Sequence, residues 1–403
     1  MSTRRAFLSQ AAILAGVALA PAGRAGAADA IKIGDINSYS ALPDFTIPYR
    51  MGWQLALRQI NERGGVLGRP LDVVSRDDGG RPGDAVTAAN ELYARERVAL
   101  LMGTFFSNVG LAVSDFARQR RILFVAAEPL SDALTLQAGN RYTFRLRPST
   151  SMQAAMLVDD AADLPAVTWA SIAPNYEYGQ SAVEAFRTLL QAKRPDVRWV
   201  AEQWPPLGKI DAGPTVQALE NARPDAIFNV TFGPDLVNFV REGNTRGLFE
   251  GRSVVSLLTG EPEYLDPLRS ETPEGWIVTG YPWSAIQTPE HDAFAAAYRD
   301  AYDDYPRLGS VVGHATMTAV AAIIAAAGST DTDRMIEAAT AVTVDTPFGP
   351  VRLRDLDHQS TMGTFVGRTA LAGNQGVMTD WRYADGADYL PPPEMVKALR
   401  PPT

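Results

Sequence analysis

INERGGVLGRPLDVVSRDD, residues 60–78, decides how the chain is interpreted, because it joins a helical pattern to a β-like run through a glycine-rich turn. Apolar residues recur at helical spacing over residues 47–62, and a strand pattern begins at residue 71. The glycine pair between them accepts the left-handed conformation that ends a helix. A phosphate loop would run from strand to helix and would need Lys-Ser or Lys-Thr where the chain has Arg69-Pro70. The stretch therefore predicts a helix-to-strand connector.

The same alternation of strands and helices continues along the chain. One series of short apolar runs extends from residues 31–36 to 122–125, and a second extends from 167–172 to 276–279. Two helical stretches follow over residues 290–327, and late strands lie between 348 and 383. Alternation of this kind is typical of βα units around a parallel sheet. The sequence predicts an α/β protein with two Rossmann-like lobes.

The N-terminus has the order of regions found in an export signal. Arg4-Arg5 precede an apolar run from Ala11 to Ala20, and Ala25-Gly26-Ala27 supplies small residues for cleavage. The run is shorter than the roughly 20 residues of a membrane-spanning helix. We therefore expect residues 1–27 to be a signal peptide that is removed on export. The paired arginines resemble the twin-arginine route, although an ordinary secretory signal has the same order of regions.

Composition excludes several classes of function. Residues 1–27 carry three arginines and no acid, so their removal changes the formal net charge of the 403-residue chain from −9 to −12. No basic run offers a surface for nucleic acid. Cysteine is absent, and the three histidines His291, His314 and His358 lie far apart. We expect no thiolate chemistry, metal site or cofactor.

Enzymatic signatures are also missing. Ser107 lies in Phe-Phe-Ser-Asn-Val, without the flanking glycines of a nucleophile elbow. Asp77-Asp78 does not continue into a calcium-binding loop, so we predict a solvated loop there. No catalytic residue is predicted, and an enzyme is the least favoured class.

Polar and aromatic residues collect where the predicted strands end. Ligands of open α/β sheets bind beyond the carboxyl ends of the strands. Aromatic residues there can instead plug the ends of the core, but seven such loops from two lobes favour a binding site in one cleft. The loops are residues 37–45, 103–108, 126–134, 175–179, 232–235, 260–264 and 280–283.

Several motifs together resemble the branched-chain amino acid type of periplasmic substrate-binding protein. They are IKIG at 31–34, NERGGVLGRPL at 61–71, RDD at 76–78, NYEYG at 175–179 and PEGW at 273–276. The resemblance implies a type I fold, with two lobes joined by three hinge strands. It also implies a monomer in the periplasm that closes on a small ligand and hands it to the permease of an ABC importer. A periplasmic sensor of the same fold, which regulates a partner protein, is the alternative.

The resemblance also implies boundaries for the parts of the chain. Lobe I is expected over residues 28–146 plus 283–345, and lobe II over 147–282 plus 346–393. Residues 394–403 are expected to be a C-terminal tail that closes the chain.

Five site residues follow from the same resemblance. Ser107 matches the hydroxyl that receives a ligand carboxylate, and Glu261 matches the acid that receives an ammonium group. Phe45, Tyr178 and Phe232 match aromatic positions of the two lobes.

Three further residues complete the predicted site. Glu128 and Leu130 occupy the loop where amino-acid binders have a Ser-x-Thr-like sequence, and Trp283 follows the last strand of the second series. Leu130 cannot donate a hydrogen bond, and an unpaired polar group of an amino acid would cost roughly 1–3 kcal/mol in a closed cleft. The predicted ligand is a small carboxylate, either an aromatic acid or a branched-chain or aromatic amino acid. A hydroxylated aromatic acid also accounts for Leu130.

Overall fold

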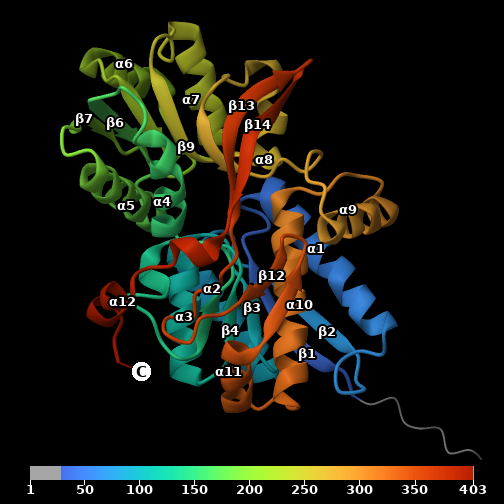
Figure 1. The fold of residues 1–403 in the computed structure, drawn as a ribbon. Coiled ribbons are helices and arrows are strands. Elements are labelled where there is room, and N and C mark those ends of the chain that lie inside the picture. Colours follow the sequence, from blue (N-terminus) through green and yellow to red (C-terminus); the bar gives the residue numbers. More distant parts are fainter. Residues whose placement is uncertain (1–28, 403) are drawn as a thin grey trace, which may run out of the picture.

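The computed structural model describes residues 29–402 and folds them into two α/β lobes, which lie one above the other in Figure 1. This arrangement confirms the predicted fold class. The predicted signal peptide, residues 1–27, lies outside the described residues.

The lower lobe in Figure 1 is built on a five-stranded parallel sheet with the order β2-β1-β3-β4-β5. Its strands are β1 (Ile31–Asn37), β2 (Leu71–Asp77), β3 (Leu101–Gly103), β4 (Phe124–Ala126) and β5 (Thr143–Arg145). The helices beside it are α1 (Pro43–Glu62), α2 (Pro82–Glu91), α3 (Ser107–Arg120), α10 (Leu308–Ala327) and α11 (Thr332–Ala341). A hairpin of β11 (Thr343–Thr346) and β12 (Gly349–Arg352) lies near α10.

The upper lobe holds a seven-stranded mixed sheet with the order β14-β13-β10-β9-β8-β6-β7. Its strands are β6 (Thr168–Ile172), β7 (Arg198–Gln203), β8 (Ala226–Asn229), β9 (Ser253–Gly260), β10 (Ile277–Gly280), β13 (Thr364–Ala372) and β14 (Gln375–Ala384). Its helices are α4 (Thr150–Ala161), α5 (Glu177–Lys193), α6 (Ala212–Ala222), α7 (Gly233–Arg246) and α8 (Pro262–Leu268), and α9 (Pro289–Tyr302) follows β10. Strands β13 and β14 are antiparallel and form one edge.

The central strands of both sheets are buried along their whole length. Every residue of β3, β4 and β8 is buried. A parallel sheet covered by helices on both faces requires this pattern, which explains why these strands appear in the sequence as short continuous apolar runs.

The glycine-rich segment between α1 and β2 is a helix-to-strand connector, as predicted. Helix α1 ends at Glu62 and β2 begins at Leu71. The Asn61 side chain donates to the Leu71 carbonyl at 2.9 Å and accepts from the Leu71 N–H at 2.8 Å, so it ties the helix end to the strand start. Gly65 has φ +75°, and a side chain there would overlap the Arg69 carbonyl. The motif is structural.

The aspartate pair at the end of β2, Asp77 and Asp78, differs from its predicted solvated state. Asp78 is 1% exposed, and its Oδ1 accepts from Ser38 Oγ at 2.6 Å and from the Gly80 N–H at 2.7 Å. It closes the turn that follows the strand, and only Asp77 remains exposed. Burial raises the pKa of Asp78.

Some elements are absent from the sequence prediction. Strand β5 has three residues, too few for a periodic pattern, and α8 contains two prolines. The expected C-terminal tail includes α12 (Pro393–Leu399). Arg400 after this helix donates to the Thr135 carbonyl at 2.6 Å, which fastens the chain end to the lower lobe.

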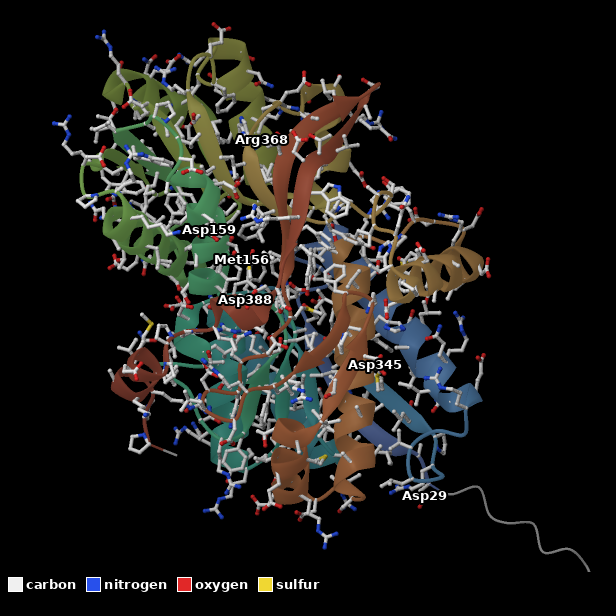
Figure 2. The ribbon with its side chains drawn as sticks, viewed as in Figure 1. Asp29, Met156, Asp159, Asp345, Arg368 and Asp388 are labelled. Atoms are coloured by element: carbon white, nitrogen blue, oxygen red, sulfur yellow. The ribbon has the colours of Figure 1, made fainter. Side chains whose placement is uncertain are left out.

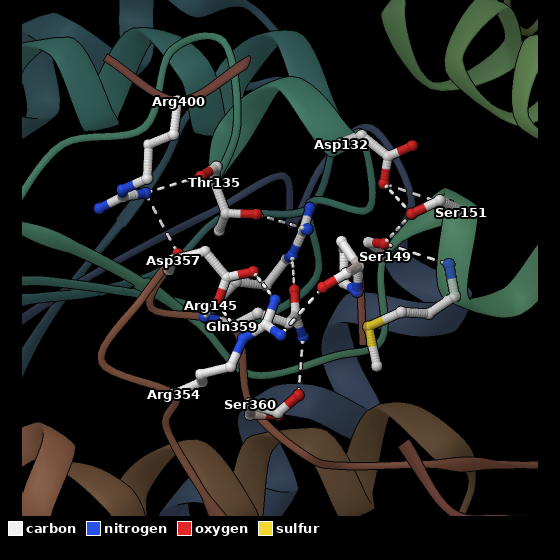
Figure 3. A network of polar contacts seen from close by, with 12 residues as sticks. Asp132, Thr135, Arg145, Ser149, Ser151, Arg354, Asp357, Gln359, Ser360 and Arg400 are labelled. Atoms are coloured by element: carbon white, nitrogen blue, oxygen red, sulfur yellow. Dashed lines mark hydrogen bonds and ion pairs between the residues drawn. The ribbon is translucent and has the colours of Figure 1, made fainter. Parts of the chain in front are cut away.

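Two segments that cross between the lobes lie side by side and share a buried polar network (Figure 3). Arg145 Nε donates to Gln359 Oε1 at 2.6 Å, and Gln359 Nε2 donates to the Arg147 carbonyl at 3.0 Å. The Ser360 N–H also donates to the Arg145 carbonyl at 3.0 Å. Gln359 therefore links both arginines of the first crossing segment to the last one.

The segment after β14 packs beside α4. Met156 and Asp159 of this helix lie close to Asp388 in Figure 2. Tyr389 donates to Asp159 Oδ2 at 2.7 Å, and Arg382 of β14 pairs with Asp160 at 2.7 Å. The late strands are thereby held against the first helix of the upper lobe.

Helix α10 is a core helix that packs along α1. Among the helices described, it has the length and apolar composition of a membrane span, but 67% of the relevant window is buried inside the protein. A Cβ atom at Gly52 of α1 would overlap the backbone of Ser310 in α10. The two helices approach this closely because glycine has no side chain.

We predict that Gly52→Ala lowers the free energy of unfolding by about 1–3 kcal/mol, because the added methyl group overpacks the α1–α10 interface. The control is Gly83→Ala in α2, where an added Cβ meets nothing within 4 Å. It should raise the stability by about 0.5–1 kcal/mol through helix propensity. Urea unfolding measures both, and shifts of the same sign would contradict the packing argument.

Candidate functional site

A small cavity lies where loops of the two lobes meet. It has about 260 Å³ of space free of protein atoms, part of which is open to solvent. Only about 20 Å³ of this space could hold a water-sized group, so side chains of the two lobes nearly fill the cavity in this closed arrangement. Its lining residues are Phe105, Ser107, Glu128, Leu130, Arg147, Tyr176, Tyr178, Phe232 and Leu258.

Five predicted site residues line this one cavity. Ser107 begins α3 directly after β3, and Glu128 and Leu130 follow β4. Tyr178 lies in the first turn of α5, and Phe232 precedes α7. All five come from segments that follow strands, which agrees with ligand binding at the carboxyl ends of parallel strands.

Aromatic rings from both lobes form a continuous wall. Phe105 of the lower lobe lies 6.0 Å from Phe232 of the upper lobe, and Tyr178 lies 5.8 Å from Phe232, between ring centroids. Phe45 is fully buried behind Phe105 at 5.0 Å. The predicted residue Phe45 therefore supports the wall from behind.

Trp283 is not brought to the cavity, in contrast to the prediction. Its ring stacks on Tyr305 at 4.5 Å with an interplanar angle of 12°. Tyr305 in turn donates to Asp266 of α8 at 2.7 Å. The chain leaves β10 toward α9, so the residue three positions beyond the strand lies at a different part of the molecule.

A buried ion-pair triad lies at the cavity, which Arg147 and Glu128 line and the predicted residue Glu261 does not. Arg147 Nη1 donates to Glu128 Oε2 at 2.8 Å, and Arg147 Nη2 donates to Glu261 Oε1 at 2.7 Å. The three side chains are 3%, 1% and 1% exposed. Charges this deeply buried are tolerated only when they are paired.

Arg147 is a residue that the sequence analysis missed. It lies in the crossing segment between β5 and α4, outside the seven loops singled out at the strand ends. The available signal was the alternation of arginine with apolar residues in Phe144-Arg145-Leu146-Arg147. Its partnership with Glu261, 114 positions away, has no local signature.

Two buried glutamates contact the Arg147 guanidinium, and a third, Glu263, lies nearby. Burial raises the pKa of Glu261 to about 8 and that of nearby Glu263 to about 7, and it also raises the pKa of Glu128. Arg147 lowers the pKa of Glu261, while Glu263 and Glu128 raise it. Burial makes these carboxyls hold a proton to higher pH than exposed glutamates do, while Arg147 at Glu261 and, at Glu263, Arg307 and the Gly309 N–H oppose this effect.

Polar atoms at the site are left for a ligand. Glu128 Oε1, Glu261 Oε2 and the Tyr178 hydroxyl have no hydrogen-bond partner among residues 29–402. Burying such atoms unpaired costs free energy, and a ligand with a donor group would pair Glu128 Oε1. In the described part of the chain, no cluster of three or more His, Asp or Glu side chains is arranged to hold a metal ion.

Ser107 is suited to an anionic group. Its Oγ accepts from the Ser131 N–H at 3.1 Å, which leaves the hydroxyl proton to be donated into the cavity. It also begins a helix of 14 residues, whose N-terminus favours negative charge.

Direct hydrogen bonds join the lobes around the cavity. Ser131 Oγ donates to Glu177 Oε1 at 2.6 Å, and the Gly309 N–H donates to Glu263 Oε1 at 2.7 Å. The lobes are therefore closed on each other in this structure.

We predict that Glu261→Gln changes the pH dependence of stability. The folded-state pKa of Glu261 is raised, so wild-type stability falls as pH rises from about 5 toward 8, whereas glutamine does not titrate. The free energy of unfolding of the variant minus that of wild type should therefore increase with pH in that window, by up to about 1.4 kcal/mol per pH unit.

Denaturant unfolding at pH 5 to 9 measures this difference. Glu274→Gln is the matched control, because it makes the same substitution at an exposed residue. A pH-independent difference for Glu261→Gln would contradict the assignment.

Comparison with known proteins agrees with this geometry. The sequence model of a family described as periplasmic binding protein matches residues 30–374. A Leu/Ile/Val-binding protein homolog of Brucella suis is 27% identical over 325 residues, which are 75% of this chain and 76% of that protein.

Two solved structures have the same fold. A solute-binding protein of an ABC transporter from Rhodopseudomonas palustris, in complex with p-hydroxybenzoic acid, superposes with a TM-score of 0.79 at 22% identity and covers 89% of this chain and 98% of its own. A leucine-, isoleucine-, valine-, threonine- and alanine-binding protein from Brucella ovis, in a closed conformation, has a TM-score of 0.78 at 20% identity, with coverages of 90% and 97%. The chain belongs to the periplasmic binding protein family, with the two-lobed type I fold.

Proposed function

We propose that this chain is an exported solute-binding protein that captures a small carboxylate in the interlobe cavity and delivers it to the permease of an ABC importer. One observation carries the proposal: aromatic rings, a hydroxyl at a helix N-terminus and a buried guanidinium from both lobes line the same cavity. A ligand that touches both lobes favours their closure. A partner such as a permease can then recognise the closed, ligand-bound form.

The site supports binding without catalysis. The Arg147 guanidinium remains charged at any pH near neutral, and Ser107 has a backbone N–H rather than a base as its hydrogen-bond partner. The proposed role of these side chains is to hold a ligand carboxylate.

Two ligand classes follow from the relatives. One structural neighbour holds p-hydroxybenzoic acid, and other relatives are named for leucine, isoleucine and valine. The aromatic wall suits a flat ring, because aromatic pairs add about 0.5–1.5 kcal/mol beyond burial. We propose the aromatic acid as the preferred class and an amino acid as its competitor.

The remaining expectations belong to the same proposal. Residues 1–27 direct export to the periplasm and are removed, and the mature protein acts as a monomer. Residues 28–146 plus 283–345 move as lobe I against residues 147–282 plus 346–393 as lobe II. The last segment, 394–403, travels with lobe I, because Arg400 is bonded to it.

We predict that aromatic carboxylates raise the melting temperature. At about 100 times the dissociation constant, a ligand should add roughly 2.7 kcal/mol to the free energy of unfolding. A thermal-shift screen of benzoate, hydroxybenzoates, leucine, isoleucine, valine and phenylalanine measures the effect. No shift with any of these compounds would contradict the proposed ligand.

We predict that Ser107→Ala weakens the bound carboxylate about tenfold or more, since a hydrogen bond to a charged group contributes about 1.5–3 kcal/mol. Ser171→Ala is the control, because Ser171 is equally buried and its Oγ has no partner, but it lies in β6 and does not line the cavity. Equal affinities of the two variants for the carboxylate would contradict the assignment of Ser107 to the binding site.

Gene deletion separates transport from sensing. Loss of uptake of the ligand identified in the screen supports the importer. Normal uptake with lost induction of a ligand-dependent gene would support a periplasmic sensor of the same fold instead.

A further inference from the structure

Arg147 is already paired with Glu261, the acid to which the family resemblance assigns a ligand ammonium group. Its Nη2 lies 2.7 Å from Glu261 Oε1, and its Nη1 lies 2.8 Å from Glu128 Oε2. The three side chains are nearly inaccessible to solvent. Glu261 therefore already binds a cation, which is part of the protein.

An incoming ammonium would meet this fixed charge. A guanidinium stays protonated, and its planar fork is held here by one carboxylate on each side. The crossing segment is also held by its backbone, because Gln359 Nε2 donates to the Arg147 carbonyl at 3.0 Å. A second cation beside Glu261 would repel Arg147 in a cavity from which most water is excluded.

An incoming carboxylate meets complementary groups instead. The guanidinium has five N–H donors, and the two ion pairs use one at each Nη, so others remain for a ligand at the cavity that Arg147 lines. Ser107 offers its hydroxyl proton at the same cavity. Glu128 Oε1 and the Tyr178 hydroxyl have no partner in the described chain and line it too.

We infer that Arg147 determines specificity by taking the place of a ligand ammonium, so that the site selects carboxylates without an α-ammonium group and rejects amino acids. This inference rests on the proposed function. The ligand carboxylate lies against Arg147 and Ser107, and a neutral donor such as a phenolic hydroxyl pairs with Glu128 Oε1.

The buried glutamates support the same selection. Burial raises the pKa of Glu261 to about 8 against the opposing effect of Arg147, so the triad takes up a proton as the pH falls through that range. The groups that face Glu261 are Arg147, Glu128, Glu263, Tyr178 and Tyr264. A bound carboxylate would hold the proton more tightly, whereas a bound ammonium would expel it.

Isothermal titration calorimetry of the full mature chain tests the inference with 4-hydroxybenzoate, benzoate, leucine and phenylalanine. Wild type should bind the two benzoates and neither amino acid. Arg147→Met should weaken the binding of 4-hydroxybenzoate by about 30-fold or more, because the cation that pairs with the ligand carboxylate is removed. The same variant should bind phenylalanine more tightly than wild type does, since Glu261 is released.

Wild type alone gives a second readout if Arg147→Met does not fold. Titration at pH 8 in two buffers with different ionisation enthalpies counts the protons exchanged on binding. Proton uptake with 4-hydroxybenzoate supports the inference, and release or no exchange contradicts it. Arg147→Lys keeps the cation and should still reject amino acids.

The outcomes separate the two proposals. Tight binding of leucine or phenylalanine by wild type would overturn the role of Arg147 and leave the solute-binding function intact. Binding of neither class would overturn the proposed carboxylate ligand and the inference together.

Discussion

The ion pairs of Arg147 are the constraint on which the site depends. A guanidinium that is almost free of solvent must be neutralised, and its two partners come from different lobes: Glu128 follows β4, and Glu261 precedes α8. Removing Glu128 or Glu261 would leave one Nη group of the buried guanidinium without its acceptor, which costs free energy. The triad therefore couples the closed arrangement of the lobes to the electrostatics of the cavity.

The crossing segments give this triad its rigidity. Arg147 stands two residues beyond β5, and its backbone is bonded to Gln359, which also accepts from Arg145. Burial lowers the pKa of Arg145 to about 10, yet the guanidinium stays charged and binds acceptors of the last crossing segment and of the loop between β4 and β5. A site group on this junction is held by the part of the chain that moves least when two lobes rotate about their connections.

Helices and strands with a periodic pattern can be predicted from the sequence, whereas contacts between residues far apart in the chain cannot. The connector at residues 60–71 follows from turn chemistry that is local, and the buried strands follow from apolar runs. Strand β5 is too short to leave a pattern, and Asp78 is buried by a turn that involves Ser38, 40 positions away. At the site, position after a strand was enough to bring Ser107, Glu128, Leu130, Tyr178 and Phe232 to one cavity, but not Trp283. Arg147 was not predicted, because its role depends on Glu261, which lies 114 positions away in the sequence.

The presence of two glutamates rather than one has a consequence for recognition. Each glutamate gives Arg147 one oxygen and keeps the other. The remaining oxygen of Glu128, Oε1, has no partner in the described chain, and Glu128 lines the cavity. A purely apolar ring placed there would leave that oxygen desolvated, whereas a hydroxyl on the ring would pair it. The same triad thus selects against a charged donor through Arg147 and in favour of a neutral donor through Glu128, and this combination distinguishes a hydroxylated aromatic acid from an amino acid of similar size.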